Sequence, residues 1–270
     1  MHFDYLDIKW DDGVVVATID DMENKNAVND QMNAEFVRLA EWMEEEPENR
    51  VLVLTGSGHI FCSGGNIKQM AEKGRALEPP PGSMRTQLHP DQEGIRKAVL
   101  ALRRTSKPVI AAINGHAVGS GIGLAAGCDI RIASDRAKFA WVFIRRGIVA
   151  DDASLALMMQ LIGYGNAFSW GVTGRTLTAQ EAMEIGFCQE VVPHDELMST
   201  AISFARNIID NAPPLTVELF KLVASSMAEE GLAAAVALTE RAQKLSHHSH
   251  DHAEALRAYS EKRAAVWEGR

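Results

Sequence analysis

The feature that most constrains the fold is a glycine-rich stretch directly after a short apolar run. The run PVIAAI (108–113) leads into NGHAVGSGIGLAAGCDI (114–130). Its glycines fall where a predicted buried strand turns into a helix that begins near Ile122. Glycines at a helix start leave backbone N–H groups uncovered, and the helix dipole favours negative charge there. The stretch therefore fits either a site for a phosphate or a developing oxyanion, or a tight packing of helix on strand.

The spacing of these glycines differs from the dinucleotide-binding pattern GxGxxG. No glycine stands three residues after Gly121, and no acidic residue ends a following strand at the expected distance. We therefore expect no nicotinamide cofactor.

Composition indicates an ordinary soluble globular protein. Its 270 residues suffice for one sizeable core, or for one core plus a small appended lobe. The net charge of −9 argues against nucleic acid or an anionic membrane as the main partner. We find neither a signal-peptide pattern nor a membrane-spanning apolar run, so we expect a cytoplasmic protein. The three cysteines, Cys62, Cys128 and Cys188, have no metal spacing and are expected to be buried thiols in a reduced compartment.

Apolar patterning predicts strands that alternate with helices, followed by a helical end. A hairpin is expected over residues 4–19, and VLVLT (51–55) is expected to be a strand covered on both sides. Helices are expected at about 30–45, 91–104, 151–154 onward, 178–186, 195–210, 214–229, 231–246 and 251–266, with further strands at CDIRIAS and QEVV. This order implies a parallel sheet with crossover connections. The polar, Pro-rich stretch 72–90 is predicted to be a mobile segment over a pocket.

Five motifs, in one order, carry a resemblance to a known family. They are FCSGGNIKQM, KPVIAAINGHAVGSGIGLAAGCDIRIAS, RRGIVADD, GRTLTAQEAMEIGFCQEVV and EALRAYSEKRAAVWEG. With them the chain resembles the enoyl-CoA hydratase/isomerase (crotonase) family along nearly all its length. The resemblance implies an α/β, crotonase-like (ClpP/crotonase) spiral of ββα units over 1–195. It also implies a helical C-terminal trimerisation region over 196–270, and assembly as a homotrimer or dimer of trimers.

The resemblance also implies an oxyanion hole built from two backbone N–H groups, those of Gly65 and Ser120. They would hold the thioester carbonyl of an acyl-CoA as it becomes an enolate. Donors that are fixed before the charge develops need no reorganisation when it appears. Gly121, beside Ser120, allows close approach of the substrate.

The catalytic acids depart from the hydratase pattern that the resemblance implies. Typical hydratases carry two glutamates, and the matching positions here are Gly123 and Phe143, neither of which can move a proton. Asp151 matches the catalytic aspartate of some members, which include dienoyl-CoA isomerases, an epoxyphenylacetyl-CoA isomerase type and an aryl-CoA dehalogenase. A single carboxylate beside an enolate suffices to move a proton between two carbons. Isomerisation with Asp151 as the sole acid–base is therefore favoured over hydration.

The surroundings of this aspartate leave its protonation open. A pocket of Trp141, Phe143 and Ile148 would raise the pKa of Asp151 by desolvation, whereas the start of a helix would lower it. Either aspartate is also a plausible helix cap, and Asp152 is expected to be one.

The remaining site residues follow from the resemblance. Backbone contacts to the adenine and pantetheine arm of CoA are expected from Lys25, Asn26, Ala27, Ser63, Gly65, Asn66 and Ile67, with Gly121 close by. Trp141 and Phe143 could stack on an aromatic acyl group or belong to the core. Lys262 is a candidate for the CoA phosphates, on this or a neighbouring subunit, or a solvated lysine. No cofactor beyond the CoA of the substrate is expected, and no metal, despite the run HHSHDH.

Two other classes of function stay open on the sequence. In one, Asp151 attacks or directs water onto a carbon or thioester, giving a CoA-thioester or C–C bond hydrolase or a dehalogenase. In the other, the chain binds acyl-CoA without turnover.

Overall fold

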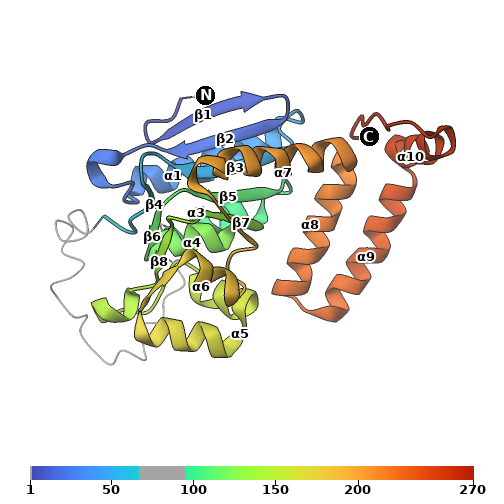
Figure 1. The fold of residues 1–270 in the computed structure, drawn as a ribbon. Helices are drawn as coiled ribbons and strands as arrows, with labels where there is room; N and C mark the ends of the chain where they lie inside the picture. Colours follow the sequence, from blue (N-terminus) through green and yellow to red (C-terminus); the bar gives the residue numbers. More distant parts are fainter. Residues whose placement is uncertain (1, 67–94) are drawn as a thin grey trace.

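The computed structural model describes residues 2–66 and 95–270, and the predicted segment 72–90 lies outside them. The described strands form two sheets, and the last helices extend from the larger one as an arm (Figure 1). The larger sheet contains, in spatial order, β1 (Leu6–Asp11), β2 (Val14–Ile19), β3 (Val51–Gly56), β5 (Val109–Ile113), β7 (Ile130–Ser134) and β10 (Glu190–Val192). The smaller sheet contains β4 (Ile60–Cys62), β6 (His116–Val118), β8 (Lys138–Ala140) and β9 (Thr176–Thr178).

The helices follow the predicted order. They are α1 (Asp30–Glu45), α3 (Ile95–Arg104), α4 (Ser120–Gly127), α5 (Ser154–Thr173), α6 (Ala179–Glu184), α7 (Leu197–Asn211), α8 (Pro214–Glu229), α9 (Leu232–His247) and α10 (His250–Glu261). The predicted hairpin is confirmed, because β1 and β2 pair antiparallel. The capping box of α6 is confirmed too, with Thr178 and Glu181 each accepting a backbone N–H of the other.

The larger sheet is buried on both faces, as the continuous apolar runs predict. In β3, Val51 and Val53 face a cluster that includes Ala201 and Ala205 of α7. Leu52 and Leu54, which alternate with them, face a larger cluster built with α1, α3 and α4. From β2 to β10 the strands pair in parallel, so their carboxyl ends meet at one edge of the sheet.

The smaller sheet was not predicted. Its strands have three residues each, which is too short for a period of two to be recognised. β4 and β6 nevertheless pair in parallel, and they lead directly into the two predicted oxyanion segments.

The C-terminal part is helical, as expected, with one shorter helix. The predicted helix 251–266 ends at Glu261, because Lys262 adopts a left-handed backbone conformation (φ 54°). Arg263 then turns back and binds Glu254, with Nη2 3.1 Å from Oε2. The division between residues 195 and 196 stays a prediction, and α7, which follows it, packs on the sheet.

Cys62, Cys128 and Cys188 are all buried and unpaired, as the sequence predicts. In the described ranges, no helix is both long and apolar enough to cross a bilayer.

Candidate functional site

Two backbone segments come into close contact at the ends of β4 and β6. The parallel pairing aligns Cys62 with Ala117, so the residues after each strand leave the same edge. Gly64 (φ 96°) is packed so tightly that an added Cβ would stand 2.8 Å from the carbonyl oxygen of Val118 and 3.6 Å from the amide nitrogen of Ser120. An added Cβ at Gly121 would overlap the carbonyl of Cys62. The structure therefore brings the predicted oxyanion segments together, and only glycine permits this approach.

The two predicted donors lie in suitable local structure. Ser120 is the first residue of α4, where a backbone N–H has no intrahelical acceptor. Gly65 forms an isolated parallel bridge with Val28, in which the partners are the neighbouring amide of Asn66 and the carbonyl of Gly64. Within the described residues, neither Gly65 N nor Ser120 N donates to a backbone oxygen.

The predicted CoA loop is tied to the same place. Lys25 and Asn26 both have positive φ (59° and 53°), and the Val28 amide donates to the carbonyl of Gly64 at 2.8 Å. The buried Asn26 side chain holds the turn, because its Nδ2 donates to the carbonyl of Ile60 at 2.7 Å and its Oδ1 accepts from the Asp21 amide. The side chain of Asn26 is therefore engaged in the turn, and the predicted backbone contact of Asn26 with CoA stays a prediction.

The two adjacent aspartates differ in burial, and the one predicted to lie in a pocket is not the buried one. Asp151, predicted to lie in a pocket, is exposed, whereas Asp152 is 0% exposed. Oδ1 of Asp152 accepts from the amide and the hydroxyl of Ser154 at 3.1 and 2.5 Å. The N-cap of α5 is Ala153, which makes no side-chain cap bond, so the prediction of Asp152 as the cap is wrong and Asp152 instead holds the turn one residue earlier. Its other oxygen, Oδ2, has no hydrogen-bond partner among the described residues. A buried carboxyl oxygen without a hydrogen-bond partner is costly, so its presence requires an explanation.

Gly123 leaves the space into which this carboxyl group points. A Cβ added at Gly123 would overlap Oδ2 of Asp152 and lie 2.8 Å from its Cγ. The carboxyl group of Asp152 therefore occupies the place from which a side chain at position 123 would start. By the resemblance, that is the position where typical hydratases carry a glutamate.

Burial raises the pKa of Asp152 to about 6, against the lowering effect of the Ser154 hydrogen bonds. The charge of Asp151 adds to the rise. Asp152 therefore changes protonation close to neutral pH, as a proton-transfer group must.

The other predicted site residues are distributed as follows. Trp141 is a core residue whose Nε1 donates to the Ser154 hydroxyl at 3.0 Å, and its ring meets Trp170 edge-on. Phe143 begins a short 3-10 helix and packs partly buried against the core. Lys262 is exposed at the end of α10, which lies at the far end of the arm from α4 (Figure 1). Ile67 lies outside the described residues.

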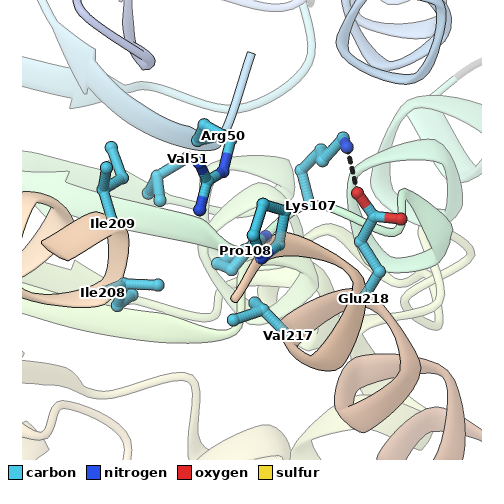
Figure 2. A pocket seen from close by; sticks show the side chains of 9 residues that line it. Arg50, Val51, Lys107, Pro108, Ile208, Ile209, Val217 and Glu218 are labelled. Carbon is cyan, nitrogen blue, oxygen red and sulfur yellow. Dashed lines mark hydrogen bonds and ion pairs between the residues drawn. The ribbon is translucent and has the colours of Figure 1, made fainter. Parts of the chain in front are cut away.

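A small pocket lies elsewhere, between the sheet and the helical arm (Figure 2). Its walls include Arg50 and Lys107, which precede β3 and β5, and Val217 of α8. Lys107 and Glu218, which both line this pocket, form an ion pair at one side of it. Because β3 and β5 are parallel, this pocket lies at the amino ends of the strands, opposite the glycine-rich turn. We assign it to the packing of α8 on the core.

The comparisons with known proteins agree with this arrangement. The family profile described as enoyl-CoA hydratase/isomerase matches residues 9–270. The chain belongs to the enoyl-CoA hydratase/isomerase family. It is 30% identical to the mevalonyl-coenzyme A hydratase of Aspergillus fumigatus, over 94% of this chain and 91% of the relative. It is also 30% identical to the 1,2-epoxyphenylacetyl-CoA isomerase of Escherichia coli, over 96% of each chain.

Solved structures of the family have the same fold. The enoyl-CoA hydratase of Bacillus anthracis superposes with a TM-score of 0.88 at 29% identity, covering 98% of this chain and 100% of that one. The expected crotonase-like fold is thereby confirmed, as is membership of an enzyme family that contains both hydratases and an isomerase.

Sequence reasoning missed the buried position of Asp152 and its partner Ser154. The available signal was the pattern Asp-x-Ser directly before a helix, in which the aspartate accepts from the residue two positions on. That pattern marks a turn, but it does not tell which aspartate oxygen stays unpaired.

We predict that Asp152→Asn stabilises the protein above pH 6 and has little effect near pH 4. The raised pKa means that the folded protein holds this proton more tightly than the unfolded chain, so stability falls as pH rises from about 4 to about 6. The rise from 3.8 to about 6 corresponds to about 3 kcal/mol, since one pKa unit is worth about 1.4 kcal/mol. Urea unfolding of wild type and variant at pH 4.5 and 7.5, at one protein concentration, measures it.

The exposed neighbour provides the matched control. Asp151→Asn removes a surface charge without emptying a buried site, so its effect on unfolding should stay below about 0.5 kcal/mol at both pH values. A pH-independent effect of Asp152→Asn would contradict the assigned protonation.

Proposed function

We propose that the protein binds an acyl- or enoyl-CoA thioester and moves a double bond through an enolate. The amides of Gly65 and Ser120 hold the thioester oxygen, and one carboxyl group at the start of α5 transfers the proton. The observation that carries the proposal is the contact between the segments after β4 and β6, each of which contributes one amide.

Electrostatics favour enolate chemistry at this place. The N-terminus of α4 contributes partial positive charge, and the surrounding glycines keep the backbone uncovered. In a dry site, such preorganised donors stabilise a developing oxyanion more than water does. The site thus lowers the cost of removing a proton next to a thioester carbonyl.

The missing glutamates favour isomerisation over hydration. Gly123 and Phe143 stand where the family pattern has two glutamates, so the two side chains that position and activate water in typical hydratases are missing from those positions. Asp151 remains the residue that the resemblance assigns to proton transfer, and Asp152 stands next to it. One relative is named an isomerase, and others are named hydratases.

CoA recognition is proposed for the loop from Lys25 to Ala27 and for Ser63 and Asn66, whose backbones lie beside the bridge between Val28 and Gly65. We propose no further cofactor. The three buried, unpaired thiols support a reducing compartment such as the cytoplasm.

Removal of one oxyanion donor tests this function. We predict that Ser120→Pro lowers kcat by about 10²- to 10³-fold, because proline has no N–H. Proline is favoured at the first position of a helix, so the fold should persist. The control Ser120→Ala keeps the amide and should stay within about threefold of wild type. Double-bond migration in 3-hexenoyl-CoA, followed by absorbance and product mass, is the assay.

Two results would contradict the proposal. Equal activity of Ser120→Pro and Ser120→Ala would show that this amide holds no oxyanion. Release of free thiol in step with substrate loss would instead indicate a thioesterase.

We also propose assembly as a homotrimer or dimer of trimers through the helical arm. The support is a set of large apolar side chains exposed on α8, α9 and α10, namely Phe220, Leu232, Val236, Leu245, Leu256 and Tyr259. Light scattering should give three or six times the chain mass of 29.5 kDa. A monomer at micromolar concentration would contradict this assembly.

A further inference from the structure

We infer that Asp152, acting through Oδ2 from the space beside Gly123, is the acid–base group that takes and returns the substrate proton. This inference rests on the proposed enolate chemistry and assigns its proton-carrying residue.

The first argument is the position of Oδ2 along α4. Gly123 follows Ser120 by three residues, so both lie on one side of the helix, about 4.5 Å apart along its axis at 1.5 Å per residue. Oδ2 of Asp152 fills the place of a Cβ on Gly123. The unpaired oxygen therefore lies against the residue that is three positions after Ser120 on the same helix, whose amide is proposed to hold the thioester oxygen.

The second argument comes from β4, the strand that leads to the other donor. The charge of Asp152 contributes to the raised pKa of the Cys62 thiol, and Cys62 stands three residues before Gly65. Cys62 lies against Gly121 of α4, the helix on which the carboxyl group of Asp152 packs at Gly123. Burial raises the pKa of the Cys62 thiol to about 12, so this thiol stays neutral and does not compete as a base. The other charged group that acts on Asp152 is Asp151, in the same turn.

The third argument is that the two carboxyl oxygens of Asp152 differ in their hydrogen bonds. Ser154 donates two hydrogen bonds to Oδ1, and Trp141 in turn holds the Ser154 hydroxyl. These bonds fix the orientation of the carboxyl group and leave Oδ2 to carry the proton. Asp151 has an exposed side chain, so it lacks both this fixed orientation and the exclusion of water.

The chemical step balances without any co-reactant. Ionised Asp152 takes a proton from the carbon next to the thioester carbonyl of a β,γ-enoyl-CoA, and the C–H electron pair moves into the dienolate. The thioester oxygen carries the resulting negative charge between the two amides. Protonated Asp152 then returns the proton to the γ-carbon, the carbonyl re-forms, and the double bond has moved by one position. The carboxyl group ends as it began.

Deuterium exchange with single variants tests the assignment. Wild type, Asp152→Asn and Asp151→Asn are incubated in D₂O with 3-hexenoyl-CoA and hexanoyl-CoA, double-bond migration is followed by absorbance, and deuterium incorporation is followed by mass spectrometry. General acid–base groups contribute about 10²- to 10⁴-fold, so we expect Asp152→Asn to lose at least 100-fold. Asp151→Asn should lose far less. Because Asp152→Asn is expected to be the more stable protein at neutral pH, loss of fold does not account for its inactivity.

A second set of variants moves the carboxyl group from the turn before α5 to α4 and measures whether activity returns. A purely structural role of Asp152 would not produce such a recovery. Gly123→Ala places a methyl group against Oδ2 and should reduce exchange at least tenfold with Asp152 intact. Asp152→Ala should be inactive. The double variant Gly123→Glu with Asp152→Ala restores a carboxyl group that starts from the space left by Asp152, and it should recover at least tenfold over Asp152→Ala.

Three outcomes would overturn the inference. Exchange retained in Asp152→Asn and lost in Asp151→Asn would assign the proton to Asp151. A folded double variant no more active than Asp152→Ala would show that the carboxyl position beside Gly123 does not matter. Wild type that binds hexanoyl-CoA but neither moves the double bond of 3-hexenoyl-CoA nor exchanges hydrogen in either thioester would contradict the enolate chemistry itself, and with it any role for Asp152.

Discussion

The contact between the segments after β4 and β6 is the constraint on which the site depends. Backbone meets backbone there, because side chains on Gly64 or Gly121 would collide with the carbonyls of Val118 and Cys62. This approach sets the start of α4 beside the loop of Gly65. It also fixes the CoA loop, because Val28 bonds to Gly64. Three segments far apart in sequence are thereby held at one edge of the sheets.

A second constraint decides which acid serves this place. Without a side chain at Gly123, α4 leaves a space, and the turn before α5 fills it with the carboxyl group of Asp152. The left-handed conformation of Ala153 (φ 65°) lets the chain turn sharply between Asp152 and the first residue of the helix. Burial then raises the pKa of the carboxyl group to about 6. In the proposed mechanism, Gly123 and the turn before α5 together place the carboxyl group of Asp152 where the family resemblance would put a glutamate on α4.

Local sequence signals sufficed for most of the fold. The alternation in the first hairpin, the continuous apolar run of β3 and the capping box of α6 each reflect interactions between near neighbours, so they can be read from a short window. The smaller sheet could not be predicted as a sheet, because its strands have only three residues each and become recognisable only through their pairing with one another. The early end of α10 depends on the pairing of Arg263 with Glu254, which forms only once the chain has turned back.

The candidate site also has some features that the sequence predicts and others that it does not. The meeting of the two glycine-bearing segments could be expected because their glycines are visible in the sequence, and their role as an oxyanion hole stays a proposal. The roles of two adjacent aspartates could not be predicted, because neighbouring side chains point in different directions and tertiary packing chooses which one is buried. Trp141 illustrates the same point: an aromatic residue that could line an acyl pocket is instead a donor to Ser154.

A crystal structure with a bound acyl-CoA analogue that cannot enolise tests the central claim most directly. The account predicts the thioester oxygen within about 3.1 Å of the amide nitrogens of both Gly65 and Ser120. It also predicts Oδ2 of Asp152 as the carboxyl oxygen closest to the carbon next to the carbonyl. A thioester oxygen bound by neither amide, or Asp151 as the closer carboxylate, would contradict the account.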